Sequence, residues 1–342
     1  MPWAVWPGRR WTAPALPSAI GAAHADEVIF TGSATEADNM AVVGACRAAP
    51  PDRRHLVISA VEHPAVLEPA LEMQRQGWRL SIAPVDRFGR LVLDELERLL
   101  HAAPAALVSV MHANNELGTI QPVAEAGALA RRHGALFHVD AAQSMGKIAV
   151  DVQTLQADLL TLAGHKMYAP KGIGALYVRR GTTLRPLLFG ASQEHGQRPG
   201  TENVAYIAGL GTAARIVTQA DAQRRQMAVL RDDLQRRLQH GIPGLLVNGA
   251  AEARLPNTLH VSLPAGSARA VVALLADEVA LSPGAACHAD APDEPSGVMR
   301  AIGATPQQAF GALRLSLGYD TTRRDIETAA DRIIAASQRL GA

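Results

Sequence analysis

Short apolar runs alternate with helical segments along the first 220 residues of the chain, and this alternation limits the fold more than any other feature. The runs are four to six residues long and comprise residues 27–30, 55–60, 106–111, 135–140 and 158–163. Strands that are apolar throughout and are separated by helices are typical of a parallel sheet covered on both faces. The sequence therefore predicts an α/β fold with a mostly parallel sheet.

The pattern changes at about residue 220. A long charged helical segment at residues 221–241 is followed by a strand-like run at 257–263, another helical segment, a second run "RLSLG" at 314–318 and a final helix at 322–340. This order predicts a smaller α+β domain. We expect a large domain at residues 1–220 and a small C-terminal domain at residues 221–342.

The amino-acid composition limits the classes of molecule that the chain is expected to bind. Basic and acidic residues nearly balance, with 33 Lys and Arg against 32 Asp and Glu, so the chain lacks the basic surplus that binds nucleic acid. No run reaches the ~20 apolar residues of a membrane helix. Only Cys46 and Cys287 are present, too few for a disulfide framework, which favours a cytoplasmic location. A small-molecule substrate is expected.

Polar residues follow the ends of the predicted strands. They occupy residues 31–35, 62–63, 112–116, 140–143 and 164–166. In open α/β sheets, ligands bind beyond the carboxyl ends of the strands. The sequence therefore predicts that five strand ends converge on one crevice.

Two charged residues in this crevice suggest its chemistry. Asp140 ends an apolar run, where its carboxylate needs a cation, either a protonated pyridine nitrogen or an arginine. Lys166 follows another run and is either a desolvated lysine that forms a Schiff base or an ordinary surface lysine. Gln143, three residues after Asp140, has an amide that is able to donate to a ring oxygen.

Three further residues fit a phosphate and an aromatic ring. Thr35 lies in "TGSATEADN", which is either an anion site at a helix N-terminus or a simple helix cap. His165 is a candidate phosphate donor, and His63 is either a ring-stacking residue or a cap before Pro64. Each is weak alone, but together with Asp140 and Lys166 they indicate pyridoxal 5'-phosphate.

Several segments carry a family resemblance. The chain contains "HANNELGTIQPV", "HVDAAQSMGK", "GHKMYAPKGIGALYVRR", "RPGTEN" and "LRLSLG". From about Gly8 to the C-terminus it resembles the cysteine desulfurases and selenocysteine lyases, pyridoxal-phosphate enzymes of the class V aminotransferase group with the fold type I architecture. "GAACHADAPDEPSGVMRAIG" is similar to the cysteine-bearing loop of that family and leans toward its lyase-like branch.

The resemblance implies roles for particular residues. It implies that Lys166 holds the cofactor, that His63 stacks on the ring, that Asp140 pairs with the pyridine nitrogen and that Gln143 pairs with the phenolate oxygen. Further implied residues are Thr35 and His165 for phosphate, Thr201 for the phosphate of a partner subunit in a homodimer, and Asn115 and Arg314 for the substrate carboxylate.

Cys287 gains a role from the same resemblance. Its thiolate would attack the sulfur of cofactor-bound cysteine, leaving a persulfide and releasing alanine, and a sulfur-acceptor protein would then take the sulfur. A structural loop cysteine is the alternative. Cys46, in "MAVVGACRAA", is expected to be a small buried residue.

Other functions stay open. The family's opening strand has no counterpart before Gly8, so the large domain is expected to be N-terminally shortened, and a catalytically silent homologue that serves as an interaction protein is one alternative. A selenocysteine lyase is another. No metal site is predicted, because His112, His138, His165, Cys287 and His288 lack standard ligand spacing.

Overall fold

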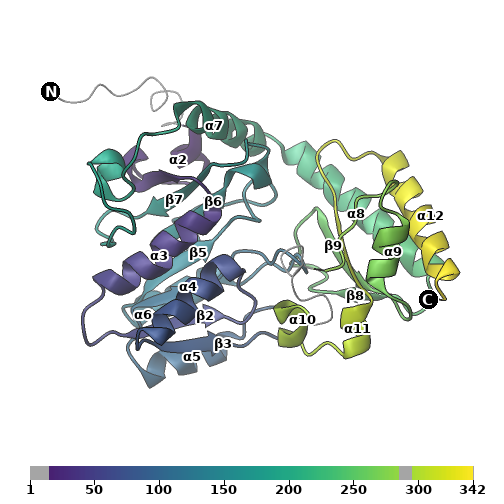
Figure 1. Ribbon diagram of the computed structural model, residues 1–342, viewed down its shortest axis with the longest axis horizontal. Coiled ribbons are helices and arrows are strands. Elements are labelled where there is room, and N and C mark those ends of the chain that lie inside the picture. The colour runs from purple at the N-terminus through teal and green to yellow at the C-terminus, as the bar shows by residue number, and fades with distance from the viewer. Residues whose placement is uncertain (1–14, 285–294, 342) are drawn as a thin grey trace. The chain divides into compact units, whose positions relative to one another are not determined.

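The computed structural model describes residues 15–284 and 295–341, so Cys287 lies outside the described residues. The chain divides into two compact units (Figure 1). The first consists of residues 1–84, 91–112 and 121–220, and the second of residues 85–90, 113–120 and 221–342. Two short segments of the N-terminal half therefore belong to the second unit.

The first unit is built on a seven-stranded sheet in the order β1-β7-β6-β5-β4-β2-β3. Its strands are β1 (Val28–Thr31), β2 (His55–Ser59), β3 (Arg79–Ala83), β4 (Leu107–Ser109), β5 (Leu136–Asp140), β6 (Leu159–Ala163) and β7 (Gly174–Val178). The five strands from β6 to β3 pair in parallel, whereas β7 is antiparallel to both of its neighbours. Because β1 and β6 are both antiparallel to β7, β1 runs in the same direction as the five parallel strands.

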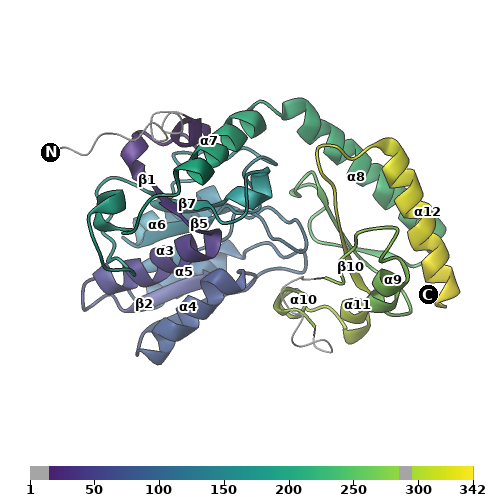
Figure 2. The same cartoon turned by 45° about the horizontal axis from the view of Figure 1, so that its top comes forward.

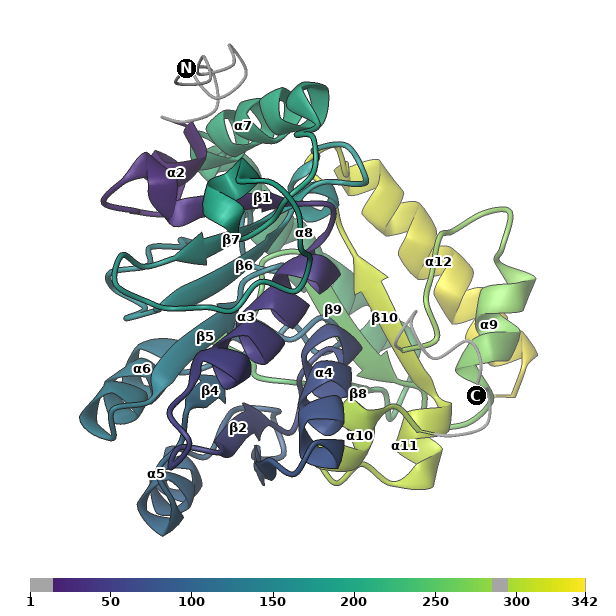
Figure 3. The ribbon, with the colours of Figure 1, turned by 60° about the vertical axis from the view of Figure 1, so that its left-hand side comes forward.

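The helices cover both faces of this sheet. They are α2 (Ala15–Ala19), α3 (Ala34–Ala48), α4 (Pro64–Arg75), α5 (Leu93–Ala102), α6 (Val123–Arg132) and α7 (Val204–Thr218), with 3₁₀ turns η1 (Ala25–Glu27), η2 (Gly164–Met167) and η3 (Gln193–Gly196). Right-handed crossovers from β1 to β2 and from β2 to β3 put α3 and α4 on one face. The connections through α5 and α6 run the other way along the sheet, so these helices cover the opposite face (Figure 3).

Burial follows from this layering. Every residue of β2, β4 and β6 is buried, as expected for strands covered on both faces. Ala41 and Cys46 of α3 pack in one core with Leu56 and Leu159 of the sheet. The edge strand β3 is different, because only its last residue, Ala83, is buried. Its residues alternate between polar and apolar, which explains why the search for continuous apolar runs did not predict it.

The second unit contains a three-stranded antiparallel sheet in the order β10-β9-β8. Its elements are α8 (Asp221–Gly241), β8 (Leu246–Asn248), β9 (Thr258–Ser262), α9 (Ala268–Leu274), α10 (Gly297–Ala301), α11 (Pro306–Phe310), β10 (Ala312–Ser316) and α12 (Arg323–Arg339). Helices α8 and α12 lie side by side (Figure 2). Leu234, Leu259, Leu313 and Ile333 form part of the core between these helices and the sheet.

Helix length and composition also decide whether a helix is able to span a membrane. Across residues 15–284 and 295–341, no helix is both long enough and apolar enough to cross a bilayer.

Candidate active site

The carboxyl edge of the large sheet gathers the predicted residues of the first unit. Gly174 at the start of β7 pairs with Thr31 at the end of β1 and with Ala163 at the end of β6. The segments that follow these two strands therefore emerge at the same edge. A Cβ atom on Gly174 would lie 2.6 Å from the backbone carbon of Ser33, so only glycine lets β7 approach this turn.

The N-terminus of α3 lies at this turn. The hydroxyl of Ser33 caps the helix by accepting the backbone N–H of Glu36 at 3.1 Å, and Glu36 in turn accepts the N–H of Gly32 at 2.6 Å. Arg198, from the "RPGTEN" segment, donates to Glu36 at 2.8 Å and offsets its charge. Thr35, in the first turn, is exposed, as a phosphate-binding hydroxyl must be.

Asp140 ends β5 with its side chain almost enclosed. It is 5% exposed, and Oδ1 accepts the backbone N–H of Ala142 at 2.8 Å. Burial raises its pKa to about 6, since the ionised carboxylate loses solvation that one N–H only partly replaces. A cation beside Asp140 would reverse this effect, and the site therefore suits a protonated ring nitrogen.

Lys166 and His165 occupy η2, directly after β6. Both are exposed, and the next turn ends at Tyr168 in a left-handed conformation with φ 68°. Burial lowers the pKa of His165, and the positive charges of Lys166, Lys171 and Lys147 lower it further. Three lysines close to one imidazole create a positive potential that favours a bound anion.

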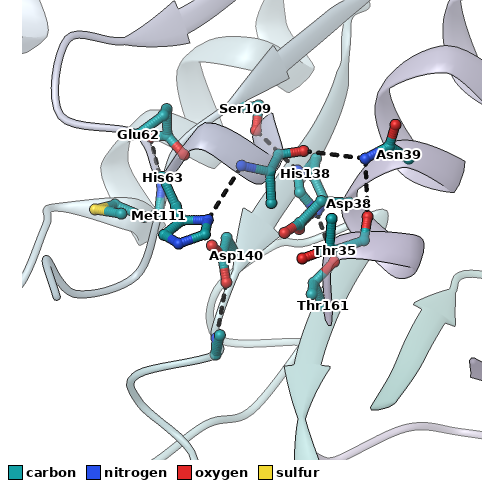
Figure 4. A network of polar contacts seen from close by, with 12 residues as sticks. Thr35, Asp38, Asn39, Glu62, His63, Ser109, Met111, His138, Asp140 and Thr161 are labelled. Carbon is teal, nitrogen blue, oxygen red and sulfur yellow. Dashed lines mark hydrogen bonds and ion pairs between the residues drawn. The ribbon is translucent and has the colours of Figure 1, made fainter. Parts of the chain in front are cut away.

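His63 caps α4, which is the simpler of its two predicted roles. Its Nδ1 accepts the backbone N–H of Ala65 at 3.1 Å (Figure 4). A surface hollow between α3 and α4 is lined by both Thr35 and His63. Asn39 bridges the two helices there, since its amide donates to the carbonyl oxygens of Thr35 at 2.9 Å and of Ala65 at 3.4 Å. The structure thus brings Thr35 and His63 together, and ring stacking by His63 stays a prediction.

The remaining predicted residue at the β5 end is Gln143. It is half-buried in the turn after Asp140, and its side-chain oxygen accepts the ammonium of Lys147 at 2.9 Å. Thr201 is exposed in the loop that precedes α7, as contact with a partner subunit requires.

The two predicted carboxylate-binding residues are neighbours within the second unit. Arg314 on β10 donates through Nη1 to the backbone carbonyl of Asn115 at 2.9 Å. Its buried Nε has no hydrogen-bond partner among the described residues. One donor of Arg314 is therefore unpaired within that part of the chain, and carboxylate binding by its guanidinium stays a prediction.

Of the two cysteines, Cys46 is the one within the described residues. It is buried on α3, and burial raises the pKa of its thiol to about 12. A thiol that stays protonated is a poor nucleophile, so Cys46 is structural, as expected.

A buried polar network under the carboxyl edge was not predicted. His138 on β5 contacts the hydroxyls of Ser109 at 2.8 Å and Thr161 at 3.1 Å, and its Nε2 lies 3.5 Å from Asp38 on α3 (Figure 4). Glu62 accepts from Ser59 and from the N–H of Met111 nearby. His138 interrupts the apolar run at residues 135–140, but Asp38 lies between the polar residues Glu36 and Asn39, so no local pattern indicates that the two side chains meet.

One cluster of metal-ligand type lies on the outer helices. Ligand atoms of Glu97 and His101 on α5 and of His133 after α6 lie within 4.8 Å of one another. Arg132 already pairs with Glu97 at 2.8 Å and would compete with a cation. We therefore assign no metal to this cluster.

The chain is similar to known proteins over nearly its whole length. Residues 15–328 match the Aminotransferase class-V family. The chain is 40% identical to the cysteine desulfurase IscS of Dictyoglomus turgidum over 327 residues, which are 95% of this chain and 82% of that protein. It is 41% identical to the cysteine desulfurase NifS of Azotobacter vinelandii over 317 residues, covering 92% and 77% of the two chains.

Solved structures give the same result for the fold. A NifS-like protein superimposes with a TM-score of 0.88 at 31% identity, covering 98% of this chain and 89% of that one. DndA from Streptomyces lividans superimposes with a TM-score of 0.76 at 35% identity, covering 91% and 88%. These similarities confirm the predicted α/β fold with its mostly parallel sheet and small C-terminal sheet. The chain belongs to the class-V aminotransferase family.

Proposed function

We propose that this protein is a pyridoxal-phosphate-dependent cysteine desulfurase that converts L-cysteine to L-alanine and transfers the sulfur to Cys287. The observation that carries the proposal is the buried carboxyl of Asp140 at the end of β5, which needs a cation to stay ionised. The two relatives described above, which carry the name cysteine desulfurase, support the same activity.

The residues at the carboxyl edge fit the cofactor. Asp140 offers a carboxylate for the ring nitrogen, the first turn of α3 carries the exposed Thr35, and Lys147, Lys166 and Lys171 supply positive potential for a phosphate. When bound, pyridoxal phosphate supplies an electron sink for bonds at the substrate's α and β carbons. Lys166 would attach it covalently, and Asp140 would hold a proton on its ring nitrogen.

The substrate would be held and its sulfur removed by other residues of the chain. Arg314, with Asn115, would bind the carboxylate of cysteine. The thiolate of Cys287 would then form a sulfur–sulfur bond as the carbon–sulfur bond of the substrate breaks, giving alanine and a persulfide. A homodimer in which Thr201 reaches the partner's cofactor, and a sulfur-acceptor protein, complete the proposal.

The test measures alanine formed from cysteine and from selenocysteine by wild-type protein and by Cys287→Ser. We expect alanine from cysteine with wild type, none with the serine variant, and a mass increase of one sulfur atom on the Cys287 peptide. The matched control is Cys46→Ser, which should keep the activity because Cys46 is buried on α3. Full cysteine turnover by Cys287→Ser, or sulfur found only on Cys46, would contradict the proposal. Activity with selenocysteine alone would favour a selenocysteine lyase, and no activity with either would favour a silent homologue.

A further inference from the structure

Asp38 is an acid in a place that does not suit a charge. It lies in α3 on the side that packs against the sheet and is 1% exposed, and only Asn39 separates it from the buried apolar residues Met40 and Ala41. An ionised carboxylate that has lost its water needs a cation or several hydrogen-bond donors. None of the roles assigned above to cofactor or substrate uses this side chain.

The nearest basic group does not supply a charge. Nε2 of His138 lies 3.5 Å from Oδ1 of Asp38, but His138 is fully buried and burial lowers its pKa to about 3. His138 is therefore a neutral imidazole at physiological pH. Oδ1 of Asp38 has no hydrogen-bond partner among the described residues, so the carboxylate form would leave a buried acceptor unsatisfied.

Other acids surround Asp38. Burial and then the negative charges of Asp140 and Glu62 raise its pKa, and a hydrogen bond from Thr161 opposes this only in part. Glu62 comes from the loop after β2, Asp140 and His138 from β5, and Thr161 from β6. Two neighbouring buried carboxyls do not both ionise readily, and one of them keeps its proton.

We propose that Asp38 is a neutral carboxylic acid that donates a hydrogen bond to the hydroxyl of Thr161, and that this leaves the negative charge of the pair on Asp140. Asp38 is thus a positioning residue, and its link to the cofactor rests on the proposed function through Asp140. The hydroxyl of Thr161 would in turn donate to Nε2 of His138, 3.1 Å away. His138 would then donate from Nδ1 to Ser109, 2.8 Å away. Each proton in the hydrogen-bonded series from Asp38 to Ser109 would thus have one defined position.

The first experiment looks for the proton directly. Infrared spectra of the cofactor-free protein, labelled with ¹³C at aspartate carboxyls, should contain the C=O band of a protonated aspartic acid at neutral pH. Labelling aspartate alone separates this band from Glu62. We expect Asp38→Asn and Asp38→Ala to remove it, and Asp94→Asn, a change at an exposed carboxyl of α5, to leave it in place. Wild-type protein without the band overturns the proposal even if no variant folds.

The second experiment measures the dissociation constant of pyridoxal phosphate against pH. Asparagine is neutral and its amide is able to donate to the hydroxyl of Thr161, so Asp38→Asn should keep both the affinity and the pH midpoint of wild type. Asp38→Ala should raise the dissociation constant about tenfold, because Thr161 loses its donor. If Asp38 were an anion, Asp38→Asn would remove a negative charge beside Asp140 and move the midpoint to lower pH, which would contradict the proposal.

The two experiments separate this inference from the proposed function. If wild-type protein does not bind pyridoxal phosphate but shows the infrared band, the proposed function fails and the protonated Asp38 stands. If wild-type protein binds the cofactor and lacks the band, the inference about Asp38 fails alone.

Discussion

Lys166 is an exposed residue that follows a fully buried strand, so its contribution is separable from stability. We expect Lys166→Ala to lose the absorbance of the covalently bound cofactor while its unfolding temperature stays close to that of cofactor-free wild type. Absorbance spectra and thermal unfolding check this. Lys171→Arg is the control, because it keeps the positive charge of a nearby exposed lysine but removes its amine, and it should keep the absorbance. An unchanged spectrum in Lys166→Ala would remove Lys166 from the site.

Asp140 gives the second prediction at this scale. Asp140→Asn should still bind the cofactor but form alanine roughly 100-fold more slowly or worse, because a neutral amide no longer stabilises a protonated ring nitrogen. Single-turnover kinetics with saturating cofactor measures this. A wild-type rate would show that Asp140 is only a structural acid.

Glu62 links burial to the pH dependence of stability. Burial raises its pKa to about 8 from the ordinary 4.5. Between pH 4.5 and about pH 8, Glu62 keeps its proton in the folded protein but has released it in the unfolded chain. The free energy of unfolding is therefore highest below pH 4.5 and decreases as the pH rises toward 8. We expect the free energy of unfolding of the cofactor-free protein to fall by up to about 1.4 kcal/mol per pH unit for this proton. Denaturant titrations from pH 5 to pH 8 should show a smaller slope for Glu62→Gln, while Glu68→Gln, on the exposed face of α4, should match wild type.

At the scale of single elements, the approach of β7 to the start of α3 depends on Gly174. A Cβ there would meet the backbone carbon of Ser33 at 2.6 Å and the carbonyl oxygen of Leu162 at 2.9 Å, and neither backbone atom is able to rotate away. We expect Gly174→Ala to destabilise the protein by about 1–3 kcal/mol in denaturant unfolding. Gly297→Ala is the matched control, because its nearest atom is the side chain of Arg300 at 4.0 Å. Equal effects of the two changes would contradict the steric argument.

The apolar runs predicted most elements well, for a physical reason. Central strands are buried on both faces, so β2 and β6 are continuous apolar runs that stand out in the sequence. The edge strand β3 alternates polar and apolar residues and is mostly accessible, so it does not form a continuous apolar run. The antiparallel direction of β7 was also beyond the pattern, since apolarity reports burial and not strand direction.

The same limit applies to the active site. The ends of the predicted strands identified Asp140 and Lys166, because a charged residue after an apolar run can be recognised from the sequence alone. The pairing of Asp38 with His138 joins a helix to a strand about 100 residues later, and nothing in local sequence indicates such a contact.

At the scale of the whole molecule, we expect a homodimer that uses the loop between β7 and α7. Phe189 in this loop is 85% exposed, and Thr201, the residue expected to reach the partner, follows in the same segment. Leu188 beside Phe189 is 49% exposed, and adjoining exposed apolar side chains, unlike single ones, mark an interface. Phe189→Asp should raise the dimer dissociation constant at least about tenfold in analytical ultracentrifugation. Phe310→Asp, at another exposed phenylalanine, should leave it unchanged, and a monomeric wild type would contradict the prediction.

The pairing of β1 with β7 has a consequence for biosynthesis. Val28 pairs with Tyr177, which the ribosome adds about 150 residues later. At roughly 5–20 residues per second, β1 waits on the order of 10–30 s for β7, the strand that pairs with it in the described part of the sheet. During that interval the growing chain carries the apolar strand β1 without its partner strand. This segment is an early candidate for binding by a chaperone at the ribosome.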